Sequence, residues 1–115
     1  ELKQSRFIEQ VMVIGEGEKM PAALIQLNFD FIKEWSERHQ YEIKDISTDE
    51  RLIQRIQKEI DFHNQKFGKW EQIKKFEITA DEWSIEAGHL TPTMKMKRKI
   101  IKEIYKNLHQ KIYNS

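Results

Sequence analysis

The 115-residue sequence has the length of one domain and can bury a modest core of its own. Its net charge of +1 excludes a uniformly basic or acidic protein, and the lack of cysteine excludes disulfide scaffolds, thiolate metal sites and cysteine nucleophiles. No apolar run approaches the ~20 residues that span a membrane, and no signal peptide opens the chain, so we expect a cytoplasmic protein.

The first predicted element is a β-hairpin near the start of the chain. Ser5 is expected to cap a short turn ahead of it. The run VMVIG, residues 11–15, is continuously apolar, EGEK turns the chain, and MPAALIQLN, residues 20–28, returns. Two such runs joined by a glycine-rich turn are typical of a hairpin.

Two helices are predicted next. Asn28 is placed to cap the first, residues 29–40, which has an apolar face. Ser47 and Glu50 have the spacing of a capping box at the start of the second, and Gly68 is expected to end it. The apolar faces comprise Phe31, Ile32 and Trp35 in the first helix and Leu52, Ile53, Ile56 and Ile60 in the second.

The remaining elements are a strand, a loop and a last helix. EQIKKFEIT, residues 71–79, has strand character, and a loop follows over residues 81–93. The last helix is expected to carry a single apolar stripe. That stripe comprises Ile100, Ile101, Ile104, Tyr105, Leu108 and Ile112.

The order of these elements predicts an α+β fold. We expect one domain over residues 1–115, with a small sheet built on the hairpin and a further strand, packed by about three helices. The chain starts at Glu1 rather than at a methionine. We therefore expect it to be a piece of a longer polypeptide.

Most of the candidate chemistry in the sequence has a simpler explanation. The four histidines show no ligand-type spacing, and the i, i+4 pair Glu59 and His63 fits a surface ion pair better than a metal site, so no metal is expected. No serine lies in a G-x-S-x-G motif. GEGEKM, residues 15–20, lacks the third glycine of a dinucleotide loop and is expected to be the hairpin turn. We assign the tryptophan and phenylalanine residues to packing.

The positive charge is concentrated at the C-terminal end. Residues 87–115 hold seven Lys and Arg against one acid, and Lys95 to Lys99 contains four of them. Pro92 favours an extended Thr91, so we expect Thr93 to cap the last helix and the cations to fill its first turns. Each cation there opposes the helix dipole, at about 0.3–1 kcal/mol. Such a cluster indicates a site for a phosphate or a developing oxyanion.

A solvated basic face is the competing interpretation of the same charges. It is the simpler one for Lys97, Lys99, Lys102 and Lys106, whereas for Lys95 both interpretations stay open.

HLTPTMKMKRKII, residues 89–101, resembles the C-terminal signature of long-chain acyl-CoA synthetases, in the adenylate-forming (AMP-binding) superfamily. The signature is similar to L-T-P-T-x-K-x-K-R, and every fixed position is present from Leu90 to Arg98. FIEQVMVIGEGEKMPAALI, residues 7–25, resembles the start of the family's last domain, and WEQIKKFEI, residues 70–78, resembles the stretch before its catalytic loop. The resemblance covers nearly the whole chain in the right order.

The resemblance implies the mobile C-terminal lid of an AMP-forming long-chain fatty acid–CoA ligase. In that family a large N-terminal adenylation domain holds ATP, Mg²⁺ and the fatty acid. The fatty carboxylate attacks the α-phosphorus of ATP while a lid lysine, which aligns with Lys95, reaches into the cleft. The lid then rotates, and the thiol of coenzyme A (CoA) attacks the acyl-adenylate.

Other positions of the signature carry weaker implications. Thr91, Thr93, Lys97 and Arg98 match the motif and are expected close to the nucleotide phosphates or in lid packing. Many superfamily members have glycine where this chain has Met94, and the long-chain branch accepts another residue there. The family's hinge and nucleotide-binding loops are not in this sequence, so the isolated piece is expected to be inactive.

A binding module of another class is the main alternative. The basic C-terminal helix would then hold nucleic acid or an anionic membrane surface. Against it, aromatic residues for base stacking are missing, and Ile100, Ile104 and Leu108 are expected in the core. A free-standing adaptor is a third possibility. We expect no nucleic-acid partner, and peripheral membrane association of the parent enzyme stays open.

Overall fold

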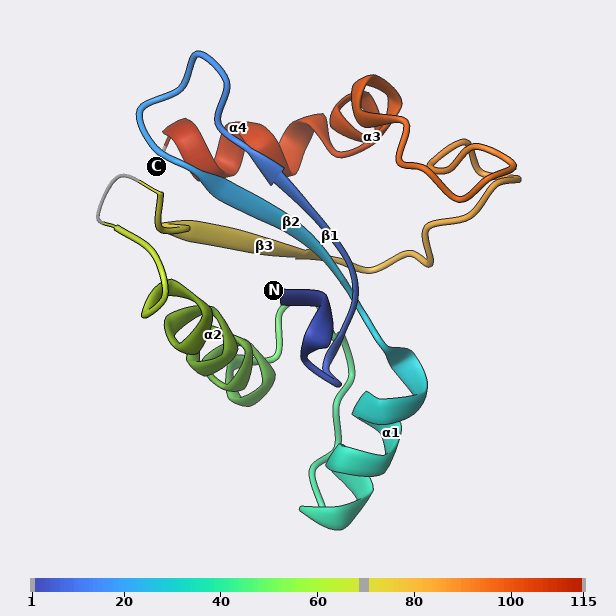
Figure 1. Cartoon of the computed structure of the whole chain (residues 1–115). Helices are drawn as coiled ribbons and strands as arrows, with labels where there is room; N and C mark the ends of the chain where they lie inside the picture. Colours follow the sequence, from blue (N-terminus) through green and yellow to red (C-terminus); the bar gives the residue numbers. More distant parts are fainter. Residues whose placement is uncertain (1, 69–70, 115) are drawn as a thin grey trace.

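The computed structural model describes residues 2–68 and 71–114 and has a three-stranded sheet with helices on both faces (Figure 1). The strands β1 (Ile8–Ile14) and β2 (Ala22–Leu27) pair antiparallel, and β3 (Lys75–Thr79) pairs parallel with β2, in the order β1-β2-β3. The predicted hairpin with a further strand, and with it the α+β class, is confirmed.

The start of β1 differs from the prediction. The strand begins at Ile8, three residues before the expected run, because Ile8 pairs with Leu27 and the carbonyl of Phe7 accepts the amide of Asn28 (2.9 Å). Ser5 accepts the Phe7 amide at its hydroxyl, which also donates to the carboxylate of Glu59 on a distant helix. The chain before β1 is therefore fixed by a tertiary contact as well as by a local cap.

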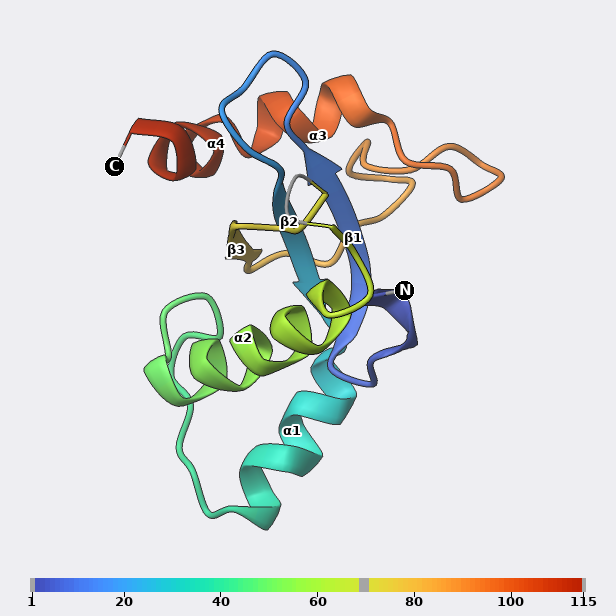
Figure 2. The ribbon, with the colours of Figure 1, turned by 60° about the vertical axis from the view of Figure 1, so that its left-hand side comes forward.

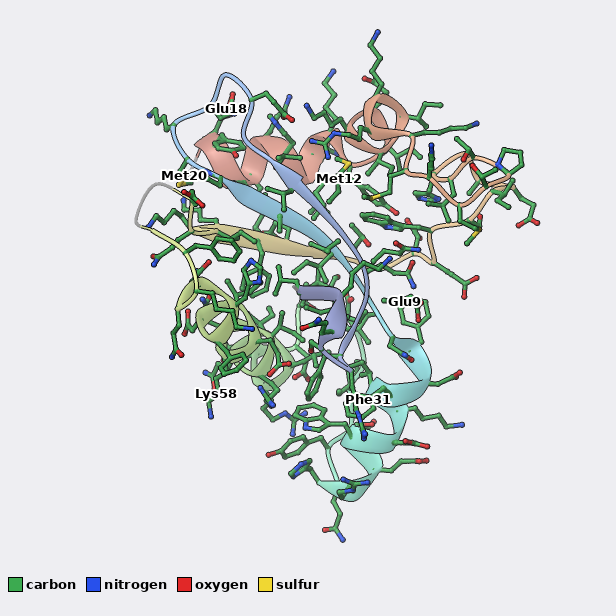
Figure 3. All side chains as sticks on the ribbon, in the orientation of Figure 1. Glu9, Met12, Glu18, Met20, Phe31 and Lys58 are labelled. Atoms are coloured by element: carbon green, nitrogen blue, oxygen red, sulfur yellow. The ribbon has the colours of Figure 1, made fainter. Side chains whose placement is uncertain are left out.

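The central strand β2 separates two hydrophobic cores. All six of its residues are buried, and alternate side chains point to opposite faces. Ala23, Ile25 and Leu27 belong to the first core, whereas Ala22 and Leu24 belong to the second. Figure 3 shows Met12 on the α3 side of the sheet and Phe31 on α1, on the other side.

Helices α1 (Phe29–Arg38) and α2 (Glu50–Asn64) cover the first core. The predicted cap of α1 is confirmed, since Asn28 accepts the Phe31 amide at its side chain (3.1 Å). The predicted cap of α2 is wrong. Asp49 accepts the Leu52 amide at its side chain (3.0 Å), whereas the Ser47 hydroxyl donates to Asp45, two residues earlier in the chain.

The predicted end of α2 is also wrong. The helix ends at Asn64, four residues before Gly68. The Asn64 side chain bonds to both the amide and the carbonyl of Ile73, at 2.9 Å each, and so joins the helix end to the chain entering β3.

The prediction that the tryptophan and phenylalanine side chains serve packing is wrong for Phe62 and Phe67, which are exposed. Trp70 lies outside the described residues.

The second core lies under two short helices where the sequence predicts one. Helix α3 (Arg98–Ile104) and helix α4 (Lys106–Asn114) are separated at Tyr105, whose φ of −105° and ψ of 30° leave helical geometry (Figure 2). The chain thus has four α-helices in the described ranges, in place of about three.

The apolar stripe of the last helix is only partly buried. Ile101, Tyr105 and Ile112 reach the second core, while Ile100 and Ile104 are 42% and 44% exposed. Their exposure removes one argument against a surface-binding role for this segment. No helix in the described ranges is long and apolar enough to cross a membrane.

Candidate functional site

The signature segment forms a tight hairpin loop at the end of the sheet, before α3 (Figure 1, orange). Thr91 and Lys95 close it: the Thr91 amide donates to the Lys95 carbonyl (2.8 Å), and the Met94 amide donates to the Thr91 carbonyl (2.8 Å). The Thr91 hydroxyl accepts the Lys95 amide (3.1 Å). Pro92 occupies the second turn position, where its fixed φ is favoured. We name residues 89–97 the Lys95 loop.

Met94 has an unusual backbone conformation in this loop. Its φ of +67° lies in the left-handed region, as expected for the third residue of a three-residue hairpin loop that follows a type I turn. Glycine adopts this conformation without strain, whereas other residues carry a penalty of about 1–2 kcal/mol. The backbone at this position therefore favours glycine over any residue with a Cβ atom.

The predicted helix start is wrong. The helix begins at Arg98, and Lys97 precedes it without a side-chain cap, so Thr93 is not the cap and Lys95 lies three residues before the helix. The left-handed Met94 interrupts helical geometry upstream. The dipole penalty therefore concerns Arg98 and Lys99 and not Lys95.

The loop amides are also not the free donors that the helix-start hypothesis requires. Those of Thr91, Met94 and Lys95 bond inside the loop, and the Lys97 amide donates to the carbonyl of His89 (2.8 Å). The hydroxyls of Thr91 and Thr93 lie 3.1 Å apart. The amides of Thr91, Met94 and Lys95 are therefore engaged within the loop, and the charge that the tip offers to an anion is that of the Lys95 side chain.

Lys95 itself is exposed on this protruding loop. Within residues 2–68 and 71–114, no acid lies within ion-pair distance of its ammonium group. Its backbone is fixed on both sides by the loop bonds, while its side chain has freedom to reach away from the domain. This arrangement presents one mobile positive charge on a defined backbone.

Arg98 is committed to the fold. Its guanidinium bonds to the Val13 carbonyl and to Glu16 in the hairpin turn, both at 2.8 Å, and Lys102 also reaches Glu16 (3.3 Å). The pKa of Glu16 is lowered to about 2, first by its own backbone amide and then by Lys102, with a smaller effect of Arg98. These contacts tie the start of α3 to the turn between β1 and β2.

Lys97, the other cation of the signature beside Lys95, is half-buried at the start of α3.

A buried polar network lies under the base of the Lys95 loop. His89, only 2% exposed, accepts the Ser84 amide at Nδ1 (3.1 Å), and its Nε2 lies 3.0 Å from the Tyr105 hydroxyl. Since Nδ1 is the acceptor, the Nε2 proton donates to Tyr105, whose hydroxyl in turn donates to Asp81 (3.2 Å). The loop is thus linked to the break between α3 and α4.

The charge states of this network follow from its burial. Burial lowers the pKa of His89 below its usual value and outweighs the Asp81 charge, which acts to raise it. Burial and the same charge raise the pKa of Tyr105 to about 12. A neutral imidazole and a neutral phenol therefore face each other at pH 7.

Trp83 completes the network from the side of the sheet. Its ring stacks on His89 with centroids 5.9 Å apart and planes 5° from parallel, and its indole N–H donates to the Thr79 hydroxyl (3.0 Å). Its backbone amide donates to the buried Gln26 side chain on β2 (2.8 Å). The base of the loop is therefore tied to the central strand of the sheet.

A sequence profile of the AMP-binding enzyme C-terminal domain matches residues 1–115, the whole chain. The chain belongs to this family. Over 99% of its length it is 30% identical to the long-chain-fatty-acid–CoA ligase FadD15 of Mycobacterium tuberculosis. Over 91% it is 28% identical to the putative fatty-acid–CoA ligase fadD11 of the same species. The chain spans 20% and 19% of these two relatives.

Two solved structures share the fold. The adenylation domain of a carboxylate reductase from Mycobacterium chelonae superposes with a TM-score of 0.78, at 16% identity, over 99% of this chain and 17% of that one. The A-PCP didomain of a carboxylic acid reductase from Segniliparus rugosus, in complex with AMP, gives 0.75, at 16% identity, over 98% and 15%.

The functional group that the Lys95 loop presents to its surroundings is the exposed ammonium of Lys95. In the described ranges, no group of three or more His, Asp or Glu side chains is placed to hold a metal ion. The Glu59 carboxylate, expected to pair with His63, bonds to Arg55 (2.8 Å) and to Ser5.

The polar network is the part of the site that the sequence hypothesis missed. His89 counted as one of four scattered histidines, and Tyr105 was assigned to an apolar stripe. The available signal was the position of His89, directly before Leu-Thr-Pro-Thr. A hairpin loop needs a fixed base, so a polar side chain at that point deserves consideration as its anchor.

Proposed function

We propose that this chain is the lid of an AMP-forming long-chain fatty acid–CoA ligase, and that Lys95 is its catalytic residue for adenylation. The overall reaction converts ATP, fatty acid and CoA into acyl-CoA, AMP and pyrophosphate. The observation that carries the proposal is an exposed lysine on a protruding, internally bonded loop, with no ion-pair partner among residues 2–68 and 71–114. The match to FadD15 over nearly the whole chain supports the substrate class.

The proposed role of Lys95 is electrostatic. In the first half-reaction a carboxylate oxygen attacks the α-phosphorus of ATP, and the bond to pyrophosphate breaks. Two anions approach each other, and negative charge spreads over the phosphate oxygens in the transition state. The Lys95 ammonium stabilises this charge without giving up its proton.

The loop geometry suits a group that must arrive and leave. The bonds between Thr91 and Lys95 keep the tip intact while the whole domain moves. In the second half-reaction the lid rotates, Lys95 withdraws, and the CoA thiol attacks the acyl carbonyl with release of AMP. The hydroxyls of Thr91 and Thr93 and the cation of Lys97 lie close enough in the chain to approach the phosphates with Lys95.

The other components of the proposed reaction bind elsewhere. ATP, Mg²⁺ and the fatty acid are held by the adenylation domain, which is the lid's own partner, and CoA enters after adenylation. The chain alone catalyses neither half-reaction. The protein works in the cytoplasm without a nucleic-acid partner, and a peripheral membrane association of the ligase fits its acyl substrate.

The basic-module alternative draws less support from the charges. Arg98 and Lys102 are paired with Glu16, and Lys111 is paired with Glu77. Three of the seven C-terminal cations are thereby partly neutralised within the domain, which weakens the attraction to a polyanion.

The test is a separation of the two half-reactions in the full-length ligase. We expect Lys95→Ala to lower acid-dependent pyrophosphate exchange by about 100-fold or more, because a charge aimed at the transition state is lost. CoA transfer from supplied acyl-adenylate should stay within about twofold, since the lysine has withdrawn by then.

Lys106→Ala is the matched control, because Lys106 is an exposed lysine of α4 outside the loop. It should leave both half-reactions unchanged. Equal losses in both half-reactions for Lys95→Ala, or no loss of pyrophosphate exchange, would contradict the proposed role.

A further inference from the structure

We propose that His89 is a positioning residue that fixes the base of the Lys95 loop and thereby sets where Lys95 is presented. The effect on catalysis rests on the proposed function of Lys95, whereas the effect on the loop does not. His89 touches no reacting group itself. It acts through the segment that carries the lysine.

His89 joins three separate segments by four hydrogen bonds, two from its side chain and two from its backbone, one of which is its amide donating to the Ser84 carbonyl (3.0 Å). Its Nδ1 holds the Ser84 amide (3.1 Å), which closes the turn before the loop, and its carbonyl holds the Lys97 amide (2.8 Å) at the loop's exit. Its Nε2 reaches the Tyr105 hydroxyl (3.0 Å) between α3 and α4. The entry and the exit of the Lys95 loop and the helix segment that supports it therefore all meet at His89.

The rest of the loop is held at its base, where the Leu90 amide donates to the Ser84 carbonyl (3.2 Å) and Leu90 forms an antiparallel bridge with Met96. Leu90 is fully buried beside His89, but the tip residues from Pro92 to Lys95 are exposed and bond only within the loop. A rigid tip on a loose base would still move as a unit. The orientation of Lys95 is thus controlled at the base.

Burial makes these bonds hard to replace. Water has little access to His89, so removal of the imidazole would leave the Ser84 amide and the Tyr105 hydroxyl without their partner in the second core. Asp81 faces the network through Tyr105, and the rings of Trp83 and Tyr105 pack against the imidazole with centroids 5.9 and 5.7 Å away. A neutral imidazole suits this enclosure.

Two substitutions separate the side-chain bonds. His89→Asn places an amide oxygen near the position of Nδ1 and can keep the Ser84 bond. His89→Gln extends an amide towards Tyr105 and can keep that bond instead. Tyr105→Phe removes only the hydroxyl and retains the ring that packs against Trp83. His89→Ala removes both side-chain bonds and leaves a cavity.

The first experiment measures amide hydrogen exchange in the chain itself. In His89→Ala we expect exchange at Lys97, whose amide bonds at the base of the loop, to accelerate by about tenfold or more, while the amides of β2 keep their rates. His89→Asn should retain most of the protection of Ser84. His109→Ala, on α4, is the control and should leave the loop amides unchanged. Unchanged exchange at Lys97 in both His89→Ala and Tyr105→Phe would overturn the proposal.

The second experiment measures the half-reactions in the full-length ligase. His89→Gln and Tyr105→Phe should lower kcat for pyrophosphate exchange by about tenfold with little change in KM for ATP, because a misplaced lysine loses transition-state contacts. CoA transfer from supplied acyl-adenylate should be unaffected.

A double-substitution cycle identifies the route of the effect. In a Lys95→Ala background, His89→Gln should cause no further loss, because it acts through the missing lysine. Additive losses would refute positioning through Lys95. If Lys95→Ala alone has no effect, the proposed function fails, and the exchange experiment still decides whether His89 fixes the loop.

Discussion

At the residue scale, Met94 shows how a side chain can be tolerated where the backbone favours glycine. It lies at φ +67° at a loop tip, with 58% of its surface exposed, so no packing compensates for its conformation. The strain stems from the Cβ atom and not from the thioether. The identity of this residue should therefore matter for stability through its backbone preference.

We expect Met94→Gly and Met94→Val to differ by about 1–2 kcal/mol in the free energy of unfolding, with glycine the more stable. Glycine relieves the left-handed strain, whereas a β-branched residue is a severe outlier there. Urea denaturation of the chain measures the difference. The same pair at Glu86, an exposed turn residue not among those with positive φ, should show no advantage for glycine.

An advantage for valine at position 94 would contradict a left-handed residue before Lys95.

Lys95 could be singled out from the sequence because cations cluster around it in a way that helix starts disfavour, although Lys95 itself lies before the helix. For His89 the only signal in the sequence is its position directly before the signature, because a lone histidine has no spacing pattern of its own. Its partners Ser84 and Tyr105 come together only through the fold.

At the scale of elements, the starts of α1 and α2 show when a helix cap can be predicted from nearby residues and when it cannot. Asn28 caps α1 as its sequence pattern predicts. For α2 two candidates lay close together, and the capping box of Ser47 lost to Asp49 because Ser47 bonds back to Asp45. Competing side-chain bonds of this kind are common before helices and are difficult to rank from sequence alone.

We expect Asp49→Ala to lower the free energy of unfolding by about 1 kcal/mol, because the Leu52 amide loses its side-chain acceptor. Ser47→Ala should change it by less than about 0.5 kcal/mol, since its bond to Asp45 is on the surface. Thermal or urea unfolding of both variants checks this. A larger loss of unfolding free energy for Ser47→Ala than for Asp49→Ala would show that Ser47, and not Asp49, caps α2.

At the scale of the whole molecule, β2 is the element that both cores share. The apolar run from Ala22 to Leu27 predicts a strand covered on at least one face, and in the structure both of its faces are covered. The parallel pairing of β3 with β2 could not be predicted, because it depends on how two distant segments meet. Nor could the break at Tyr105, which coincides with a hydroxyl directed to Asp81 and His89.

We expect Ile56→Ala in the first core and Ile101→Ala in the second each to cost about 3 kcal/mol, because both side chains are fully buried. Each variant should still unfold in one transition, since loss of either core exposes a face of β2. Tryptophan fluorescence and far-UV circular dichroism, followed together in urea, report on this. Transitions that separate in either variant would show that the two cores are independent.

The ammonium group of Lys95 takes no part in holding the domain together, whereas Thr91, Pro92 and the histidine beneath them shape the backbone that displays it. If Lys95 has the role proposed above, one substitution would remove the chemistry and leave the architecture intact. An inactive relative would then be nearly superimposable on an active one, and the two would differ in a single exposed side chain.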